Sequence, residues 1–297
     1  MTNSLVPIPA KSPLTKALKN VSRNLGGIVG ATFVLFAVGC AICAPLLTSY
    51  DPTKLDFSAR LVAPTISWTS FGPHPLGTDQ LGRDIWARLA YGGRTTLAIS
   101  ICGVMLACLV GVIAGLIAGY RAGLLDRFVM RFVDVQLAFP VMLLALMVVA
   151  AVGPNALTII VVLALTGWAR FARVIRGEVL SLRCREFVVS AEAAGARPAR
   201  ILFRHILPNT MASIVVLATL ELARFILMES SLSFLGVGVQ PPTPSWGRML
   251  AEGRQFMERA WWLSTLPGVM IVVVILGVSF LGDWMRDRFD PKIQGRK

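Results

Sequence analysis

The chain has 297 residues, of which 55% are apolar and only 15% are charged, and its formal net charge is +13. Its mean hydropathy is +0.69, whereas ordinary soluble domains contain about 25% charged residues. This composition excludes a disordered protein and argues against a soluble enzyme. The basic excess is mostly arginine at the ends of apolar runs. A nucleic-acid-binding surface would instead need a basic stripe with interleaved aromatic residues.

Long apolar runs predict membrane-spanning helices. Runs without Asp, Glu, Lys or Arg occupy residues 24–50, 95–120, 135–169 and 260–282, and a spanning helix needs roughly 20 apolar residues. Gly153-Pro154-Asn155 favours a turn that divides the longest run. We therefore predict an all-α integral membrane protein with six spanning helices. They cover about residues 26–48, 95–119, 133–152, 156–175, 210–233 and 262–282.

The distribution of basic residues predicts the orientation of these helices. With the N-terminus inside, the cytoplasmic segments hold 20 Lys and Arg residues and the outer loops hold eight, as the positive-inside rule requires. The first apolar run is also longer than the 7–15 residues of a signal peptide. We predict a cytoplasmic segment over 1–24, a transmembrane domain over 25–283 and a cytoplasmic tail over 284–297. Both termini would then face the cytoplasm.

The first outer loop, residues 49–94, contains a candidate short helix. Asp84 and Arg88 stand one turn apart on it. Trp86 and Leu89 would let this helix lie flat at the membrane interface.

Small residues recur every four positions in the second predicted helix. These residues are Gly103, Ala107, Gly111, Gly115 and Gly119. Such a stripe lets another helix approach closely, so we interpret it as a packing surface rather than a ligand site.

A polar, arginine-rich loop is predicted over 176–209. Residues 186–194 are good helix formers, and Gly195 follows them as a C-cap that needs a positive φ. Pro198 suits the first turn of a second short helix. The small side chains of Ala191, Ala193 and Ala194 offer a surface that a partner protein could approach. The alternative is an ordinary solvated helical loop.

The fifth predicted helix carries three ionisable residues, Glu221, Arg224 and Glu229. Ionisable groups in a spanning segment usually face a cavity or one another. They could line a polar translocation path for a charged solute. Alternatively, Glu221 and Arg224 form an internal ion pair and Glu229 lies near the outer interface.

Other chemistry finds little support in the sequence. The phosphate-binding loop of an ATPase needs a Gly-Lys pair, and the chain has none. If ATP drives this protein, another chain must therefore bind it, and we expect no cofactor in this chain. Cys40-x-x-Cys43 has metal-ligand spacing but no second pair of ligands, so no metal site is predicted. We find no catalytic set and expect no enzymatic activity.

The loop over 186–208 resembles the EAA loop of permease subunits of binding-protein-dependent ABC importers. In that family a glycine, nine further residues and Ile-x-Leu-Pro follow one another, and here Gly195 is followed at that spacing by His205-Ile-Leu-Pro208. The literal Glu192-Ala-Ala is out of register by three residues, and Val189-Ser-Ala occupies the family's position. The role of that glutamate therefore does not transfer to this chain.

Further motifs resemble the dipeptide/oligopeptide/nickel branch of these permeases. They are His74-Pro-Leu-Gly-Thr-Asp-Gln-Leu-Gly-Arg-Asp84, Gly119-Tyr-Arg-Ala-Gly123, Glu229-Ser-Ser-Leu-Ser-Phe-Leu-Gly-Val-Gly238, Pro241-Pro-Thr-Pro-Ser-Trp-Gly247 and the tail beginning at Gly282. The tail matches the second, shorter permease of such a pair. The resemblance covers about residues 25–292.

The resemblance implies a type I ABC importer fold and a function. The chain would be the membrane permease of an ATP-driven importer of peptides or a related small solute. Its partners would be a second homologous permease, two ATP-binding subunits and an external solute-binding protein, within the lipid bilayer and without nucleic acid. A separate ATPase subunit would dock on the coupling loop through Glu186, Ala191, Ala193, Ala194, Gly195 and Pro198.

Two other classes of function were weighed against this one. An ion-coupled secondary transporter or channel would show broken helices or acidic relays at mid-membrane, and only the fifth helix offers such residues. A membrane-embedded hydrolase would need a nucleophile and base, which the motifs do not supply. The resemblance also implies a location in a bacterial inner membrane. The sequence leaves the solute open among a peptide, a nickel complex, glutathione and another small molecule.

Overall fold

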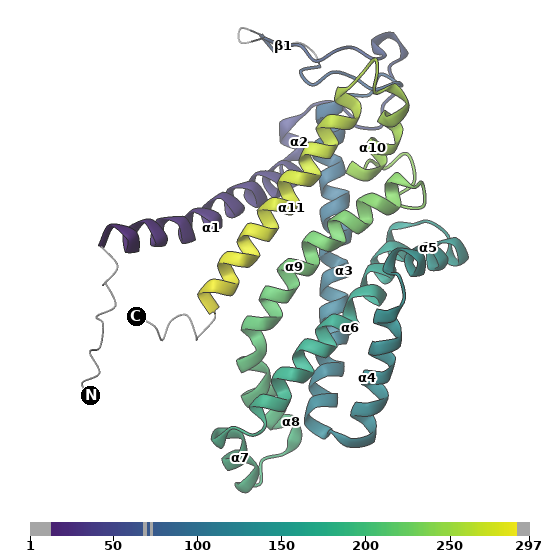
Figure 1. The fold of residues 1–297 in the computed structure, drawn as a ribbon. Helices are drawn as coiled ribbons and strands as arrows, with labels where there is room; N and C mark the ends of the chain where they lie inside the picture. Colours follow the sequence, from purple (N-terminus) through teal and green to yellow (C-terminus); the bar gives the residue numbers. More distant parts are fainter. Residues whose placement is uncertain (1–12, 68–69, 72–73, 290–297) are drawn as a thin grey trace, which may run out of the picture.

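The computed structural model describes residues 13–67, 70–71 and 74–289. The described chain forms an elongated helical bundle (Figure 1). Its helices are α1 (Pro13–Ile42), α2 (Ala44–Leu47), α3 (Ile85–Arg121), α4 (Gly123–Ala138), α5 (Val141–Val152), α6 (Ala156–Leu182), α7 (Glu186–Ala193), α8 (Pro198–Ile201), α9 (Leu207–Phe234), α10 (Trp246–Gly253) and α11 (Trp262–Phe289). Single 3-10 turns lie at Phe57–Ala59 and Arg254–Phe256, and Leu202–Ile206 forms a π-helical turn.

The two ends of the bundle differ in the short strands and helices that lie there. A small antiparallel pair of strands, β1 (Ile66–Ser67) and β2 (Ser70–Phe71), lies at one end with α10. We call this the α10 end. The short helices α7 and α8 lie at the opposite end, which we call the α7 end (Figure 1).

The number of membrane spans agrees with the prediction of six. Five described helical segments are long and apolar enough to cross a bilayer. A sixth span is formed if α4 and α5, which meet at an angle of 92°, are counted together. The predicted segments over 1–24 and 284–297 lie partly outside the described residues, which begin at Pro13 within α1 and end at Phe289.

The stripe of small residues on α3 packs against α6, as its spacing predicts. A Cβ atom added to Gly111 would lie 2.3 Å from the backbone oxygen of Trp168, and one added to Gly115 would lie 2.7 Å from that of Ala172. Real Cβ atoms do not approach so closely. The two backbones are therefore in contact, and Ala107, one turn before Gly111, is fully buried.

The single helix predicted over 133–152 is wrong, because two helices with a sharp bend occupy this region. Phe139, with φ −80° and ψ 139°, is extended, and Pro140 follows it. Proline has no N–H to donate to a preceding turn and disfavours helical backbone in the residue before it. The chain therefore breaks at Phe139-Pro140, and α4 extends back to Gly123 rather than to residue 133.

The short interfacial helix expected within residues 49–94 is also absent as a separate element from the described part of that loop. Asp84 instead caps α3, because its carboxylate accepts the backbone N–H of Ala87 at 2.7 Å. From that cap α3 continues for 37 residues. The residues assigned to a flat helix are thus the first turns of a spanning helix.

The predicted loop over 176–209 is more helical than expected. Helix α6 continues to Leu182, so Arg170 lies near the middle of a helix rather than in its last turns. After α7, the helical segment Pro198–Phe234 is continuous for 37 residues through the π-helical turn. The first helix was predicted to reach residue 48, but α1 ends earlier, at Ile42.

Candidate functional site

The predicted C-cap after α7 is confirmed. Gly195 has φ +75°, and its N–H donates to Glu192 O at 2.9 Å while the N–H of Ala196 donates to Ala191 O at 3.0 Å. These two bonds form a Schellman motif, which requires left-handed backbone at the glycine. Pro198 occupies the first turn of α8, also as predicted.

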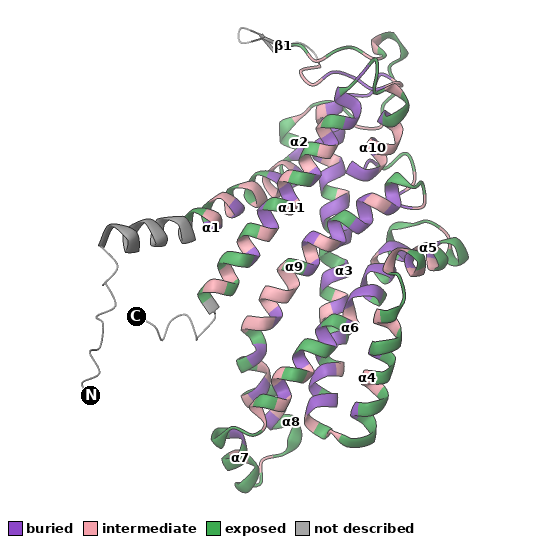
Figure 2. Cartoon of the chain, in the orientation of Figure 1, coloured by how far each residue is buried: buried purple, intermediate pink, exposed green. Residues whose placement is uncertain are grey.

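Helix α7 leaves most of its surface exposed (Figure 2). Val188 is its only buried residue. Of the six residues predicted to dock a partner, five are exposed and Ala191 is half-buried against the core. Two apolar side chains, Phe187 and Val189, are 43% and 51% exposed.

One side-chain hydrogen bond connects α7 to the spanning helix α3. The hydroxyl of Tyr120 donates to Glu192 Oε1 at 3.0 Å. Tyr120 lies in the last turn of α3, next to Arg121. A displacement of α7 would therefore act directly on the end of α3. The sequence motif containing Tyr120 did not reveal this contact, because its partner lies 72 positions away.

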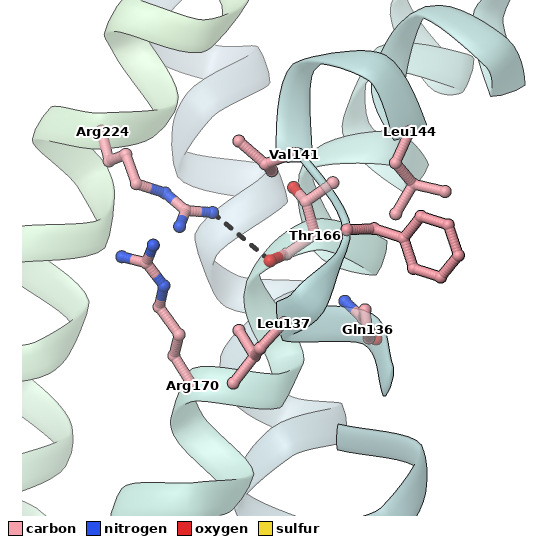
Figure 3. A pocket seen from close by; sticks show the side chains of 8 residues that line it. Gln136, Leu137, Val141, Leu144, Thr166, Arg170 and Arg224 are labelled. Carbon is pink, nitrogen blue, oxygen red and sulfur yellow. Dashed lines mark hydrogen bonds between the residues drawn. The ribbon is translucent and has the colours of Figure 1, made fainter. Parts of the chain in front are cut away.

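A pocket opens beside the break between α4 and α5 (Figure 3). It has a volume of about 170 Å³ and is lined by residues from α4, α5, α6 and α9. Apolar side chains such as Leu137, Val141 and Leu144 form part of its wall. Arg170 from α6 and Arg224 from α9 also line it.

The predicted pair of Glu221 and Arg224 is present, but it has a third member. Glu221 Oε2 lies 3.2 Å from Arg224 Nε, and Glu221 Oε1 accepts a hydrogen bond from Arg170 Nη1 at 3.1 Å. The side chain of Glu221 is only 3% exposed, whereas that of Arg170 is 46% exposed. Sequence reasoning missed Arg170, because the helix it predicted ends at residue 175, about two turns before the end of α6 at Leu182.

Glu229 does not line this pocket. Its side chain is fully buried, and its carboxyl is hydrogen-bonded by Ser233 at 2.8 Å. Thr96 from α3 and Ser245 before α10 also lie within hydrogen-bonding reach of it. Glu229 therefore connects three segments, α9, α3 and the start of α10, and the structure gives it a role in holding the α10 end together.

A buried ion-pair network lies at the α10 end. Asp79 accepts hydrogen bonds from Arg83 Nε at 2.6 Å and from Arg88 Nη1 at 2.5 Å. Both guanidinium groups also contact Glu252 of α10 at 2.9 Å. This network joins the loop before α3 to the helix that precedes α11.

The same network sets the titration of Glu252, which lies outside the spanning helices. Burial alone would raise the pKa of the Glu252 carboxyl, but the positive charges of Arg88 and Arg83 outweigh it and lower that pKa below its ordinary value. His74 at this end contacts Asp84 at 2.9 Å. Among the described residues no group of three or more His, Cys, Asp or Glu could hold a metal ion.

Comparisons with protein families give two matches. Residues 111–295 match the family described as the binding-protein-dependent transport system inner membrane component. Residues 12–64 match the N-terminal transmembrane domain of oligopeptide transport permease C. The two matches together cover both ends of the described chain.

Several relatives are similar over nearly their whole length. The chain is 39% identical over 285 residues to the di/tripeptide transport system permease protein DppC of Pseudomonas aeruginosa, covering 95% of this chain and 93% of that protein. It is 41% identical to the dipeptide transport system permease protein DppC of Alkalihalophilus pseudofirmus, covering 96% and 92%. It is also 41% identical to the glutathione transport system permease protein GsiD of Salmonella paratyphi A, covering 97% and 94%.

One solved structure supports the fold. A chain of the MetNI methionine ABC transporter in an inward-facing conformation matches with a TM-score of 0.55 at 19% identity. The match covers 67% of this chain and 94% of that chain.

Proposed function

Because the chain belongs to the family of binding-protein-dependent transport system inner membrane components, we propose that it is the permease through which an ATP-driven importer moves small peptides. The chain is a transport permease and not an enzyme. The named relatives transport dipeptides, di/tripeptides and glutathione, which are all short peptides. Their near full-length similarity supports a peptide as the solute of this chain.

The proposal that a separate subunit hydrolyses ATP rests on the exposed helix α7. Importers of this kind combine permease, ATP-binding and solute-binding subunits. A short helix with a single buried residue, held by a rigid glycine cap, is suited to dock into another protein. We assign the exposed faces of Glu186, Ala193, Ala194, Gly195 and Pro198, with half-buried Ala191, to an ATP-binding subunit.

The remaining partners follow from the same arrangement. A second permease would complete the translocation path, two ATP-binding subunits with Mg²⁺ would dock at the α7 end, and a solute-binding protein would dock at the α10 end. The α7 end and both termini would lie in the cytoplasm. The excess of Lys and Arg in the segments at that side supports this orientation.

The path itself is proposed to pass the pocket beside the α4–α5 break. Ionisable groups inside spanning helices generally face a cavity or each other. Arg224 lines this pocket and pairs with the buried Glu221. Glu229, which the sequence assigned to the same path, supports the outer part of the bundle instead of lining the pocket.

Reconstitution of the complete complex in proteoliposomes tests this function. We expect uptake of radiolabelled alanyl-alanine only when ATP, the ATP-binding subunits and the solute-binding protein are all present. A non-hydrolysable ATP analogue is the control. The permease purified alone should show no ATP turnover. Uptake without ATP, driven by a proton or sodium gradient, would show that the chain is a secondary transporter.

The orientation has a separate test. A cysteine placed at Pro154, in the turn between α5 and α6, should react with a membrane-impermeant maleimide applied from outside. A cysteine placed at Ala193 should react only after the membrane is opened, and it should form a cross-link to an ATP-binding subunit. The reverse pattern of labelling would invert the assignment of the two ends.

A further inference from the structure

The pocket beside the α4–α5 break contains more positive than negative charge. Two guanidinium groups, those of Arg170 and Arg224, face it, and one carboxylate, that of Glu221, lies between them. The charges therefore sum to one excess positive charge. The side chain of Glu221 is 3% exposed and that of Arg224 is 22% exposed. An excess charge among packed helices is costly when it has no counter-ion, so this pocket favours an anion.

The ion pair inside the cluster is poorly aligned. Arg224 Nε and Glu221 Oε2 are 3.2 Å apart, yet neither atom has a hydrogen-bond partner among the described residues. Arg224 Nη2 makes only a 3.3 Å contact with the backbone oxygen of Thr166. An arginine binds a carboxylate best through two parallel N–H···O bonds. Both arginines thus retain donors that a second carboxylate could use.

Figure 3 shows the guanidinium ends of these two side chains facing each other on one side of the pocket. They come from different spanning helices, α6 and α9. On the far wall, Gln136 donates its amide N–H to the backbone oxygen of Leu165. Its Oε1 atom has no hydrogen-bond partner among the described residues. The pocket therefore offers positive donors on one side and apolar side chains along the rest of its wall.

We propose that Arg170 and Arg224 together bind the carboxylate of the solute as it passes through the permease. This inference rests on the proposed function and adds the chemical class of group that the path recognises, which is a carboxylate such as a peptide C-terminus. Glu221 keeps the two guanidinium groups in place while the pocket is empty. When the carboxylate enters, it takes the unused donors, and the cluster becomes neutral overall.

The chain offers a matched control for this role. Arg173 lies one turn beyond Arg170 on α6 and is 51% exposed, but it pairs with Asp134 and does not line the pocket. Arg173→Gln removes the same charge from the same helix. Arg170→Lys keeps the charge at the site and loses only the planar fork of donors.

The test compares two solutes that differ only at the carboxylate, alanyl-alanine and alanyl-alanine amide. Uptake by the complete complex is measured for each variant relative to wild type with the same solute, so selection by the solute-binding protein cancels. Arg170→Gln and Arg224→Gln should each lower uptake of alanyl-alanine at least tenfold and uptake of the amide less than twofold. Arg173→Gln should leave both within twofold, and Arg170→Lys should retain most uptake of alanyl-alanine.

A direct binding measurement is needed if the solute-binding protein does not deliver alanyl-alanine amide to the permease. Saturation-transfer NMR on the complex without its solute-binding protein should detect alanyl-alanine with wild type and Arg173→Gln, and not with Arg170→Gln or Arg224→Gln. Normal uptake of alanyl-alanine by both glutamine variants would overturn the inference while leaving the proposed function intact. Equal loss of both solutes would also overturn it, because the arginines would then be needed for transport in general and not for the carboxylate. Failure of wild type to import any peptide would instead overturn the proposed function.

Discussion

Helices α7 and α10 both have eight residues and lie at opposite ends of the bundle, but they are held very differently. In α10, Trp246, Gly247, Met249 and Gly253 are all buried, and the indole N–H of Trp246 donates to Leu89 O at 2.9 Å. In α7 only Val188 is buried. Helix α10 is therefore held by contacts within the chain, whereas helix α7 presents a surface that the described residues do not cover.

The way in which each helix begins shows the same difference. Ser245 caps α10, because its hydroxyl accepts the N–H of Arg248 at 3.3 Å. Helix α7 has no side-chain cap at its first turn. A short isolated helix is marginal in water, so α7 depends on its glycine cap and on whatever binds it. We expect substitutions at the α10 end to affect folding, and substitutions at the α7 end to affect assembly and transport.

The largest effect is expected for Asp79→Ala at the α10 end. The change leaves Arg83 and Arg88 buried with fewer partners, and breaking a buried ion pair costs about 3–5 kcal/mol. Thermal unfolding of the purified permease in detergent measures the loss. The control is Asp134→Ala, which removes an exposed pair with Arg173 and should cost less than about 1 kcal/mol. Equal effects of the two variants would contradict the comparison.

Gly247→Ala should destabilise the α10 end by about 1–3 kcal/mol through overpacking. The added Cβ would lie 2.3 Å from the backbone oxygen of Ser230, so α10 must move away from α9. Gly177→Ala on α6 is the control, since a Cβ there meets nothing within 4 Å. That control should be neutral or stabilising by up to about 1 kcal/mol, because alanine favours helix. Unfolding temperatures of the two variants that shift in the same direction would refute this expectation.

Gly195→Val tests the α7 end by backbone strain alone. Space around this glycine is open, but its φ of +75° is strained for a β-branched residue by about 1–2 kcal/mol. We expect normal amounts of permease in the membrane, weaker retention of the ATP-binding subunits during purification and reduced transport. Ala193→Trp should do the same by steric clash with the docked subunit.

Gly195→Asn is the matched control, since asparagine tolerates left-handed backbone. It should retain transport. Normal transport by both Gly195→Val and Ala193→Trp would mean that α7 is only a solvated loop. Disappearance of both variants from the membrane would contradict the comparison, because the α7 end would then be needed for folding.

The smallest effect is a pH dependence confined to the α10 end. The pKa of Glu252 is lowered in the folded protein. The charged carboxylate therefore stabilises the fold fully above the unfolded pKa of about 4.3, and this stabilisation is lost as the pH falls through the folded pKa. Unfolding temperatures from pH 7 to pH 3.5 should therefore fall more steeply for wild type than for Glu252→Gln. The difference between the two variants should grow as the pH falls. Parallel pH profiles would argue against a stabilising role for the charged form.

Local signals in the sequence predicted the features that depend on neighbouring residues. The spacing from Gly103 to Gly119 predicted a close helix contact, since small residues every four positions lie on one helix face. The helix-forming run before Gly195 predicted the C-cap, because the cap bonds span only a few residues. The apolar runs predicted the number of spans. Each of these features is determined within one or two helical turns.

Features that depend on distant residues were not predictable in this way. Asp79 and Glu252 are linked by two arginines that both carboxylates contact. One of these arginines, Arg83, lies 169 positions before Glu252 in the sequence. The prediction placed Arg170 near the end of a helix, because charged residues were taken to mark the end of the membrane span. Helix α6 in fact continues to Leu182. Pro140 indicated a helix break, but the strong apolarity of residues 135–152 favoured the prediction of one continuous helix. Which helices lie side by side is determined by the packing of the whole bundle.

The continuous helix from Pro198 to Phe234 has a consequence for the lengths that the chain can tolerate. An α-helix turns by about 100° per residue. Insertion or deletion of one residue between Pro208 and Arg224 would therefore swing the arginine out of its pocket, however conservative the residue. Within Leu202–Ile206 the outcome differs, because the π-helical turn already holds one residue more than an α-turn, with the N–H of Leu207 reaching back to Leu202 O. A deletion there would restore regular helix and leave α8 and Arg224 in phase.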